Sequence, residues 1–202
     1  MRYTFIGLLI LTASASTSLG HSVATVSLRQ LFREADVVAH IKVDINYEAQ
    51  VFDVPPYRAR VLEAFKGTQT GSYVYFGPYA SCTVGKEYLV FLKSSNTLMS
   101  DHCKGSCPTS LTPGAPYLWI MYEGYSVLPV GQTELLSRGS TGVRVCYRQV
   151  TLPDSLYRVN DEHAGGASAK VWVYKEDLVL ILLELSREPQ EAPTPTVTSQ
   201  GA

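Results

Sequence analysis

The segment Tyr57–Leu92 constrains the fold of this chain more than any other. In residues 57–62, the arginines at positions 58 and 60 stand between apolar or aromatic residues, which is the two-residue period of a strand with one face in solvent. A glycine-bounded polar segment at 67–71 is suited to a turn and precedes an aromatic strand at 73–76. Residues 88–92 are apolar on both faces, which predicts a central strand covered on both sides. The segment therefore predicts a β-meander around which the rest of the chain packs.

Two further elements are predicted before this meander. Ser27 can cap a short helix over residues 27–34, and Gln30 stands three positions later, as in a capping box. The apolar residues of this helix share one face, so we expect that face to dock on the sheet. Residues 36–45 then alternate with a two-residue period and predict the first long strand.

The second half of the chain carries several shorter β patterns. Residues 117–130 predict either an aromatic strand pair or one strand bent at Gly124, and residues 143–150 alternate as a further strand. Residues 175–185 fit either a helix or a buried strand, and their leucine content favours the helix.

The order of five motifs in the first half of the chain resembles bacterial secreted proteins related to tissue inhibitors of metalloproteinases and netrin modules. The motifs are Glu34–Val38, Tyr57–Leu62, Phe65–Gly67, a lone Cys82 and Gly85–Phe91. That family is built on an OB-type barrel, so the resemblance implies a mainly β fold with an OB-like five-stranded barrel. The eukaryotic inhibitors chelate the protease zinc through an N-terminal cysteine. No cysteine lies near the start of this chain, so inhibition by that mechanism is not expected.

These patterns and the resemblance together suggest the domain organisation. We expect the barrel core at residues 21–105 and a disulfide-linked β extension of the same domain, ending in a helix, at residues 106–187. Residues 188–202 are rich in Pro, Gln, Thr and Ser without apolar periodicity, which predicts a disordered tail.

Residues 1–20 have the anatomy of a signal peptide, with Arg2 near the start, a short apolar core and a run of mostly small residues. Cleavage after Ala15 and cleavage after Gly20 both fit the pattern. We therefore expect a secreted or periplasmic protein. Stable membrane insertion is not expected, because no apolar run reaches the roughly 20 residues that a spanning helix needs.

The chain has four cysteines, and an even number in an exported protein favours two disulfides. Spacing alone leaves all three pairings open. The family resemblance favours Cys82 with Cys103, which leaves Cys107 with Cys146. A metal site at the closely spaced Cys103 and Cys107 is the alternative, but a structural zinc site needs four clustered ligands.

Residues 94–116 are rich in Ser, Thr, Gly and Pro and predict a long stapled loop. Long loops are often functional, so this loop and the aromatic segment after it are the candidate binding region. The binding candidates are Ser94, Ser95, Asn96, Tyr117 and Trp119. The alternative is a disulfide-held crossover that closes the barrel, with the aromatic residues filling the core.

The remaining features separate the classes of function. A net charge of −1 argues against nucleic acid as a partner, because nucleic-acid binders usually carry a basic excess. The known catalytic motifs are absent from the sequence, so no catalytic residue, metal or cofactor is predicted. A histidine at the mature N-terminus, His21, could chelate copper if cleavage follows Gly20. We expect an exported protein-binding module, with a glycan as a possible ligand; the alternative is an extracytoplasmic enzyme with a metal-dependent or hydrolytic site.

Overall fold

The computed structural model describes residues 25–53, 55–78, 81–112, 114–137, 139–146, 149–161 and 170–189. Residues 1–20, His21 and residues 190–202 lie outside them, and so do Tyr79, Tyr147 and residues 162–169. The signal peptide, the copper-binding terminus and most of the predicted tail are therefore predictions that this structure does not address.

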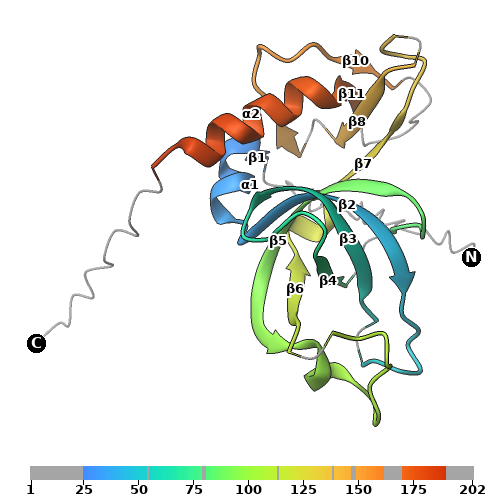
Figure 1. Cartoon of the computed structure of the whole chain (residues 1–202). Helices are drawn as coiled ribbons and strands as arrows, with labels where there is room; N and C mark the ends of the chain where they lie inside the picture. Colours follow the sequence, from blue (N-terminus) through green and yellow to red (C-terminus); the bar gives the residue numbers. More distant parts are fainter. Residues whose placement is uncertain are drawn as a thin grey trace, which may run out of the picture.

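The fold is mainly β and contains a closed five-stranded barrel, as the sequence predicted (Figure 1). Its strands are β2 (Val37–Asn46), β3 (Tyr57–Lys66), β4 (Tyr73–Gly77), β5 (Glu87–Leu98) and β6 (Pro116–Ile120). They pair in the order β2-β3-β4-β6-β5 and back to β2, and only the pair β4–β6 is parallel. This is the strand order of the OB-fold. β6 closes the barrel, because it pairs with β4 on one side and with β5 on the other.

The barrel interior is filled by alternate residues of every strand, because successive side chains of a strand point to opposite faces. The interior includes Val37, Ala39, Ile41 and Val43 of β2, Val74 and Phe76 of β4, Tyr88, Val90 and Leu92 of β5, and Leu118 of β6. The predicted period-2 pattern of the first long strand is therefore confirmed, and β2 begins one residue later than predicted.

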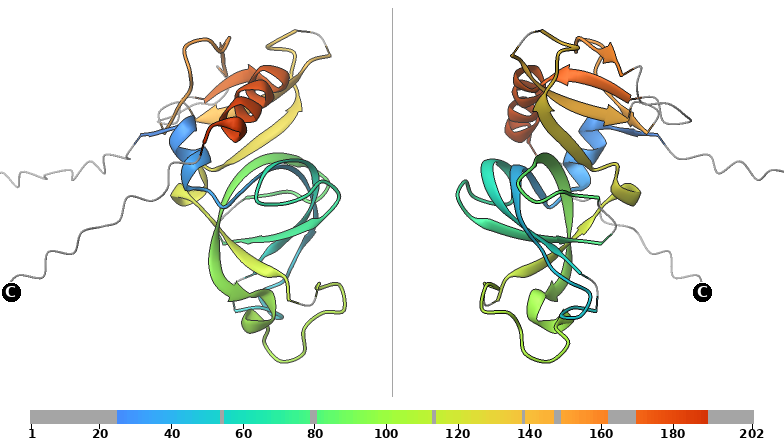
Figure 2. Two further views of the ribbon diagram at one scale, coloured as in Figure 1. Left: turned by 60° about the vertical axis from the view of Figure 1, so that its left-hand side comes forward. Right: turned by 90° about the vertical axis from the view of Figure 1, so that its right-hand side faces the viewer.

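The same sheet continues from β5 away from the barrel. This part of it consists of β7 (Val127–Gln132), β8 (Thr141–Cys146), β11 (Lys170–Tyr174) and β10 (Val159–Asn160), paired in that order. A separate two-stranded parallel ladder joins β1 (Val26–Ser27) to β9 (Val150–Thr151). We call β7, β8, β10 and β11 the upper sheet, since it lies above the barrel in Figures 1 and 2.

β6 and β7 lie one after the other along the same partner strand, β5. Ile120 pairs with Leu92, and after a short break Val127 pairs with Val90. The break contains the 3-10 helix η2 (Tyr122–Gly124), with Gly124 at a φ of 97°. The sequence left open a strand pair or a bend at Gly124, and the structure shows two strands separated by a turn there.

Two helices fill the space between the upper sheet and the barrel wall. α1 (Leu28–Glu34) begins at Ser27, whose side chain accepts a hydrogen bond from the amide of Gln30, so the predicted N-cap is confirmed. α2 (Lys175–Arg187) confirms the helix that leucine content favoured. Apolar residues of both helices, including Leu31, Phe32, Leu178 and Leu182, form one cluster with Leu89 and Phe91 on the outer face of β5. This explains why residues 88–92 are apolar on both faces.

Candidate functional site

The predicted binding residues lie on two adjacent barrel strands rather than in a loop. β5 continues to Leu98, so Ser94, Ser95 and Asn96 belong to a strand. The predicted loop start at residue 94 is therefore wrong, because backbone pairing with β6 extends the strand. The pairing is irregular between Ser94 and Leu98, and Asn96 is exposed there with a φ of 58°.

Ser95 is fastened to β6 at this irregularity. Its hydroxyl donates a hydrogen bond of 2.7 Å to the carbonyl oxygen of Tyr117 and lies 2.7 Å from the hydroxyl of Thr97. Thr97 in turn lies 3.0 Å from Nε2 of His102. These contacts hold the end of β5 in one arrangement beside Tyr117.

Tyr117 and Trp119 play different parts although they are neighbours on the outer face of β6. Tyr117 is fully buried under the loop that follows β5, in a cluster with Met99 and Ala115, so it offers no surface to a partner. Trp119 keeps 40% of its surface exposed. The two rings meet edge to face with centroids 5.3 Å apart, a favourable aromatic geometry. The buried ring of Tyr117 therefore supports the exposed ring of Trp119 beside it.

Lys93 lies directly opposite Trp119 across the β5–β6 ladder, and its position is fixed. Its ammonium donates hydrogen bonds of 2.9 Å to the carbonyl of Glu34 and to the carboxylate of Asp36, which also accepts one from the amide of Ser94. Burial raises the pKa of Asp36, but the hydrogen bonds from Lys93 and Ser94 lower it. Together with the positive charge of Lys93, they outweigh burial, so the pKa of Asp36 is below its ordinary value. The ionised carboxylate of Asp36 therefore holds Lys93 and the backbone of Ser94 in place on β5.

We define the Trp119 surface as Lys93 and Trp119, which are exposed and pair directly across adjacent strands of the closed barrel. Ser94 and Asn96 are also exposed, but Ser94 pairs with the interior residue Leu118 and Asn96 lies in the irregular part of the ladder. The exposed indole is the apolar group of this surface, and the lysine opposite it is a cation. Such a pair can bury an aromatic anchor beside a polar group at its rim.

The loop after β5 covers the lower end of the barrel, away from the upper sheet (Figure 1). It begins with the 3-10 helix η1 (Met99–His102), and Met99 and Leu111 are buried against Tyr75 of β4. The loop is also tied to the segment before β3, because the amide of Lys104 donates to the carbonyl of Val51 at 2.7 Å. It is a packed cover, which agrees with the crossover alternative of the sequence analysis.

The disulfide pairing that the resemblance implied is wrong in this structure. Cys103 is bonded to Cys107 within the lower loop, with their Cα atoms 5.5 Å apart. Cys82 is a buried free thiol inside the barrel cluster, and Cys146 is a partly exposed free thiol at the end of β8. Cys103 and Cys107 are only four residues apart in the lower loop, just after η1, whereas Cys146 lies on the upper sheet, away from the loop. The closely spaced cysteines form a disulfide bridge.

A second group of ionisable residues lies between the barrel and α2, and among them only His40 is buried. His40 is 5% exposed, and its Nε2 lies 2.9 Å from a carboxylate oxygen of Glu87. Burial lowers the pKa of His40, the nearby Lys175 lowers it further, and Glu87 and Glu63 oppose both effects. The cavity beside His40 is only about 10 Å³ and is otherwise mostly apolar, so the pair has no room for a substrate.

No group of three or more metal-ligating side chains is found among the described residues. The described part of the chain also contains no helix that is long and apolar enough to span a membrane. Comparison with known proteins found no matching family model, no matching curated protein and no matching solved structure. The class that the structure itself defines is a mainly β protein with a closed five-stranded mixed barrel and an added upper sheet.

Proposed function

We propose that this chain is an exported protein-binding module that contacts its partner through the Trp119 surface. Three sequence features support export and binding: the signal-like residues 1–20, the cysteines, and the resemblance to secreted proteins related to tissue inhibitors of metalloproteinases and netrin modules. The proposal does not involve zinc chelation by an N-terminal cysteine; it concerns contact with the surface of a partner protein.

The observation that carries the proposal is the exposure of Trp119 on a rigid strand. Tryptophan is strongly enriched among the residues that dominate protein interfaces. An indole that is 40% exposed, with Tyr117 packed beneath it and Lys93 fixed opposite, needs little ordering when a partner covers it. Preorganisation of this kind lowers the entropic cost of association.

The test compares three forms of the mature protein as bait against the exported proteins of the cells that produce it. These are the wild type, Trp119→Ala and a matched control, Tyr157→Ala. Tyr157 is 60% exposed outside the barrel, so its truncation removes an exposed ring of another surface. We expect wild type and Tyr157→Ala to capture the same protein, and Trp119→Ala to bind the purified partner roughly 30-fold more weakly, because a central interface tryptophan contributes about 2 kcal/mol.

Two results would contradict the proposal. Equal binding by Trp119→Ala and wild type would show that the partner uses another surface. Loss of wild-type binding after enzymatic removal of the partner's sugars would show that the ligand is a glycan, which exposed aromatics can also stack against.

A further inference from the structure

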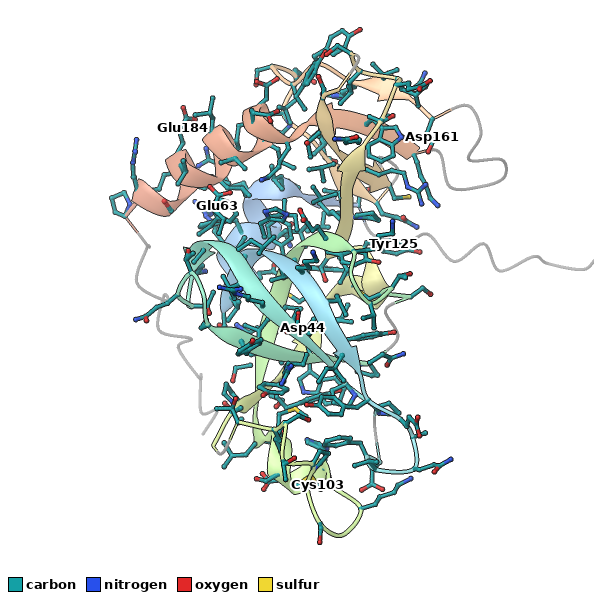
Figure 3. All side chains as sticks on the ribbon, turned by 45° about the vertical axis from the view of Figure 1, so that its right-hand side comes forward. Asp44, Glu63, Cys103, Tyr125, Asp161 and Glu184 are labelled. Atoms are coloured by element: carbon teal, nitrogen blue, oxygen red, sulfur yellow. A yellow bond between two sulfur atoms is a disulfide. The ribbon has the colours of Figure 1, made fainter. Side chains whose placement is uncertain are left out.

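A cleft opens on the side of the molecule where the barrel meets the upper sheet. It has a volume of about 300 Å³, at the lower end of the range for small-molecule sites. Its walls include Tyr125, Val127 and Pro129 on one side and Arg144, Cys146 and Lys170 on the other. The labelled Tyr125 and Asp161 in Figure 3 lie along this side, at the junction and above it.

The register of the upper sheet explains why two cations line this cleft. Lys170 pairs with Cys146 and Trp172 pairs with Arg144, so the four side chains share one face of the β8–β11 ladder. The alternate residues Val143, Val145, Val171 and Val173 are buried on the opposite face, against the helices. The burial of the valines therefore fixes Arg144 and Lys170 on the outer face.

Among the residues that the structure describes, the positive charge of the cleft is only partly balanced. Arg144 lies 3.6 Å from a carboxylate oxygen of Asp161 and 6.0 Å above the ring of Trp172. Within the described part of the chain, Lys170 has no carboxylate at ion-pair distance. One positive charge thus remains beside the apolar wall of Val127 and Pro129. An anion with a single charge and an apolar body complements this arrangement.

We propose that the cleft binds a small monocarboxylate with an apolar body. The carboxylate lies between Arg144 and Lys170, and the apolar body lies against Val127 and Pro129. An arginine fork suits a carboxylate, because it can donate two parallel hydrogen bonds to it. This site is separate from the Trp119 surface and does not depend on it.

The test uses 2-naphthoate as the probe and its neutral amide, 2-naphthamide, as the matched control. Titration calorimetry of the mature protein is expected to show one saturable site for 2-naphthoate and binding of the amide weaker by about tenfold or more. Arg144→Gln and Lys170→Met are each expected to weaken 2-naphthoate by a similar factor. Lys42→Met removes an exposed lysine from the barrel wall and is expected to leave the affinity unchanged.

Cys146 provides a second readout, because it lines the cleft. Bound 2-naphthoate is expected to slow the alkylation of Cys146 by N-ethylmaleimide in proportion to occupancy. Cys82 reports folding in the same sample, because its thiol is buried and becomes alkylated only in a variant that has unfolded. No saturable binding, equal binding of acid and amide, or unchanged alkylation at saturation would overturn the proposal.

Discussion

Gly67 lies directly against the backbone of Asp36: a β-carbon on residue 67 would be 1.8 Å from the carbonyl oxygen of Asp36. The φ of Gly67 is 67°, a conformation that other residues adopt only with strain. Gly67 thus closes the end of the β3–β4 hairpin on the residue whose carboxylate fixes Lys93 and Ser94. The turn and the Trp119 surface are therefore structurally connected.

We predict that Gly67→Ala destabilises the protein by about 3 kcal/mol or more, from backbone strain together with overpacking against Asp36. The matched control is Gly71→Ala in the same turn. Gly71 has a φ of 86°, but a β-carbon there would meet no atom within 4 Å, so only strain of about 1 kcal/mol is expected. Urea denaturation of both variants measures the difference. Equal losses would mean that the contact with Asp36 relaxes freely.

His40 is expected to make stability depend on pH. Its pKa is lowered in the folded protein from the ordinary value of 6.5, chiefly by burial. The unfolded chain therefore binds a proton at higher pH than the folded protein does. The stability that neutral His40 contributes is fully present above pH 6.5, and it is lost as pH falls from there toward the lower folded pKa.

The measurement is the free energy of unfolding from about pH 8 to about pH 5, compared between wild type and His40→Gln. The variant should lose the decline in stability that sets in below pH 6.5. Glu87→Gln should enlarge the decline in stability. Glu87 raises the pKa of His40, so without it the folded pKa is lower still and the decline continues to lower pH. Identical pH profiles for wild type and His40→Gln would show that another group is responsible.

The single bridge between Cys103 and Cys107 predicts a native mass two hydrogen atoms below that of the fully reduced protein. Under native conditions one thiol, Cys146, should be alkylated, while Cys82 should react only after unfolding. Burial raises the pKa of Cys82 to about 12, so its reactive thiolate is scarce. A mass four hydrogens below the reduced value would show that Cys82 and Cys146 are also oxidised.

Replacement of both bridging cysteines by alanine should cost about 2 kcal/mol, the chain-entropy value for a very short loop. The small loop between them limits the entropy that the bridge removes from the unfolded chain. The free energy of unfolding of the double variant itself should be the same with and without reductant, because the variant has no bridge to reduce. A loss above about 4 kcal/mol would indicate that the bridge also holds the loop on the barrel.

The docking of α2 can be tested with two leucines of one helix. Leu182 is fully buried and Leu180 is 60% exposed. Leu182→Ala should cost about 2 to 5 kcal/mol, because it leaves a cavity between the helix and the upper sheet. Leu180→Ala should change the free energy of unfolding by less than about 0.5 kcal/mol. Equal effects in thermal unfolding would mean that α2 does not pack as described.

Several elements could be predicted from the sequence because their signals are local. The cap at Ser27, the glycine-bounded turn and the two-residue period of β2 each depend on residues close in sequence. The leucine content of residues 178–185 favoured α2 for the same reason. The barrel itself was expected from the family resemblance and the meander.

The sequence by itself determined the two helices and the strands of the meander, since side-chain period and turn chemistry are properties of neighbouring residues; it did not indicate that β5 continues to Leu98 or that β11 is a strand. Only the tertiary structure decided that Tyr117 is buried while Trp119 is exposed, because both lie on the same face of β6 and differ in what the lower loop covers. It also decided the pairing of Cys103 with Cys107 and the convergence of Arg144 with Lys170. These features depend on strand register and chain reversal, which bring together residues that no local pattern relates.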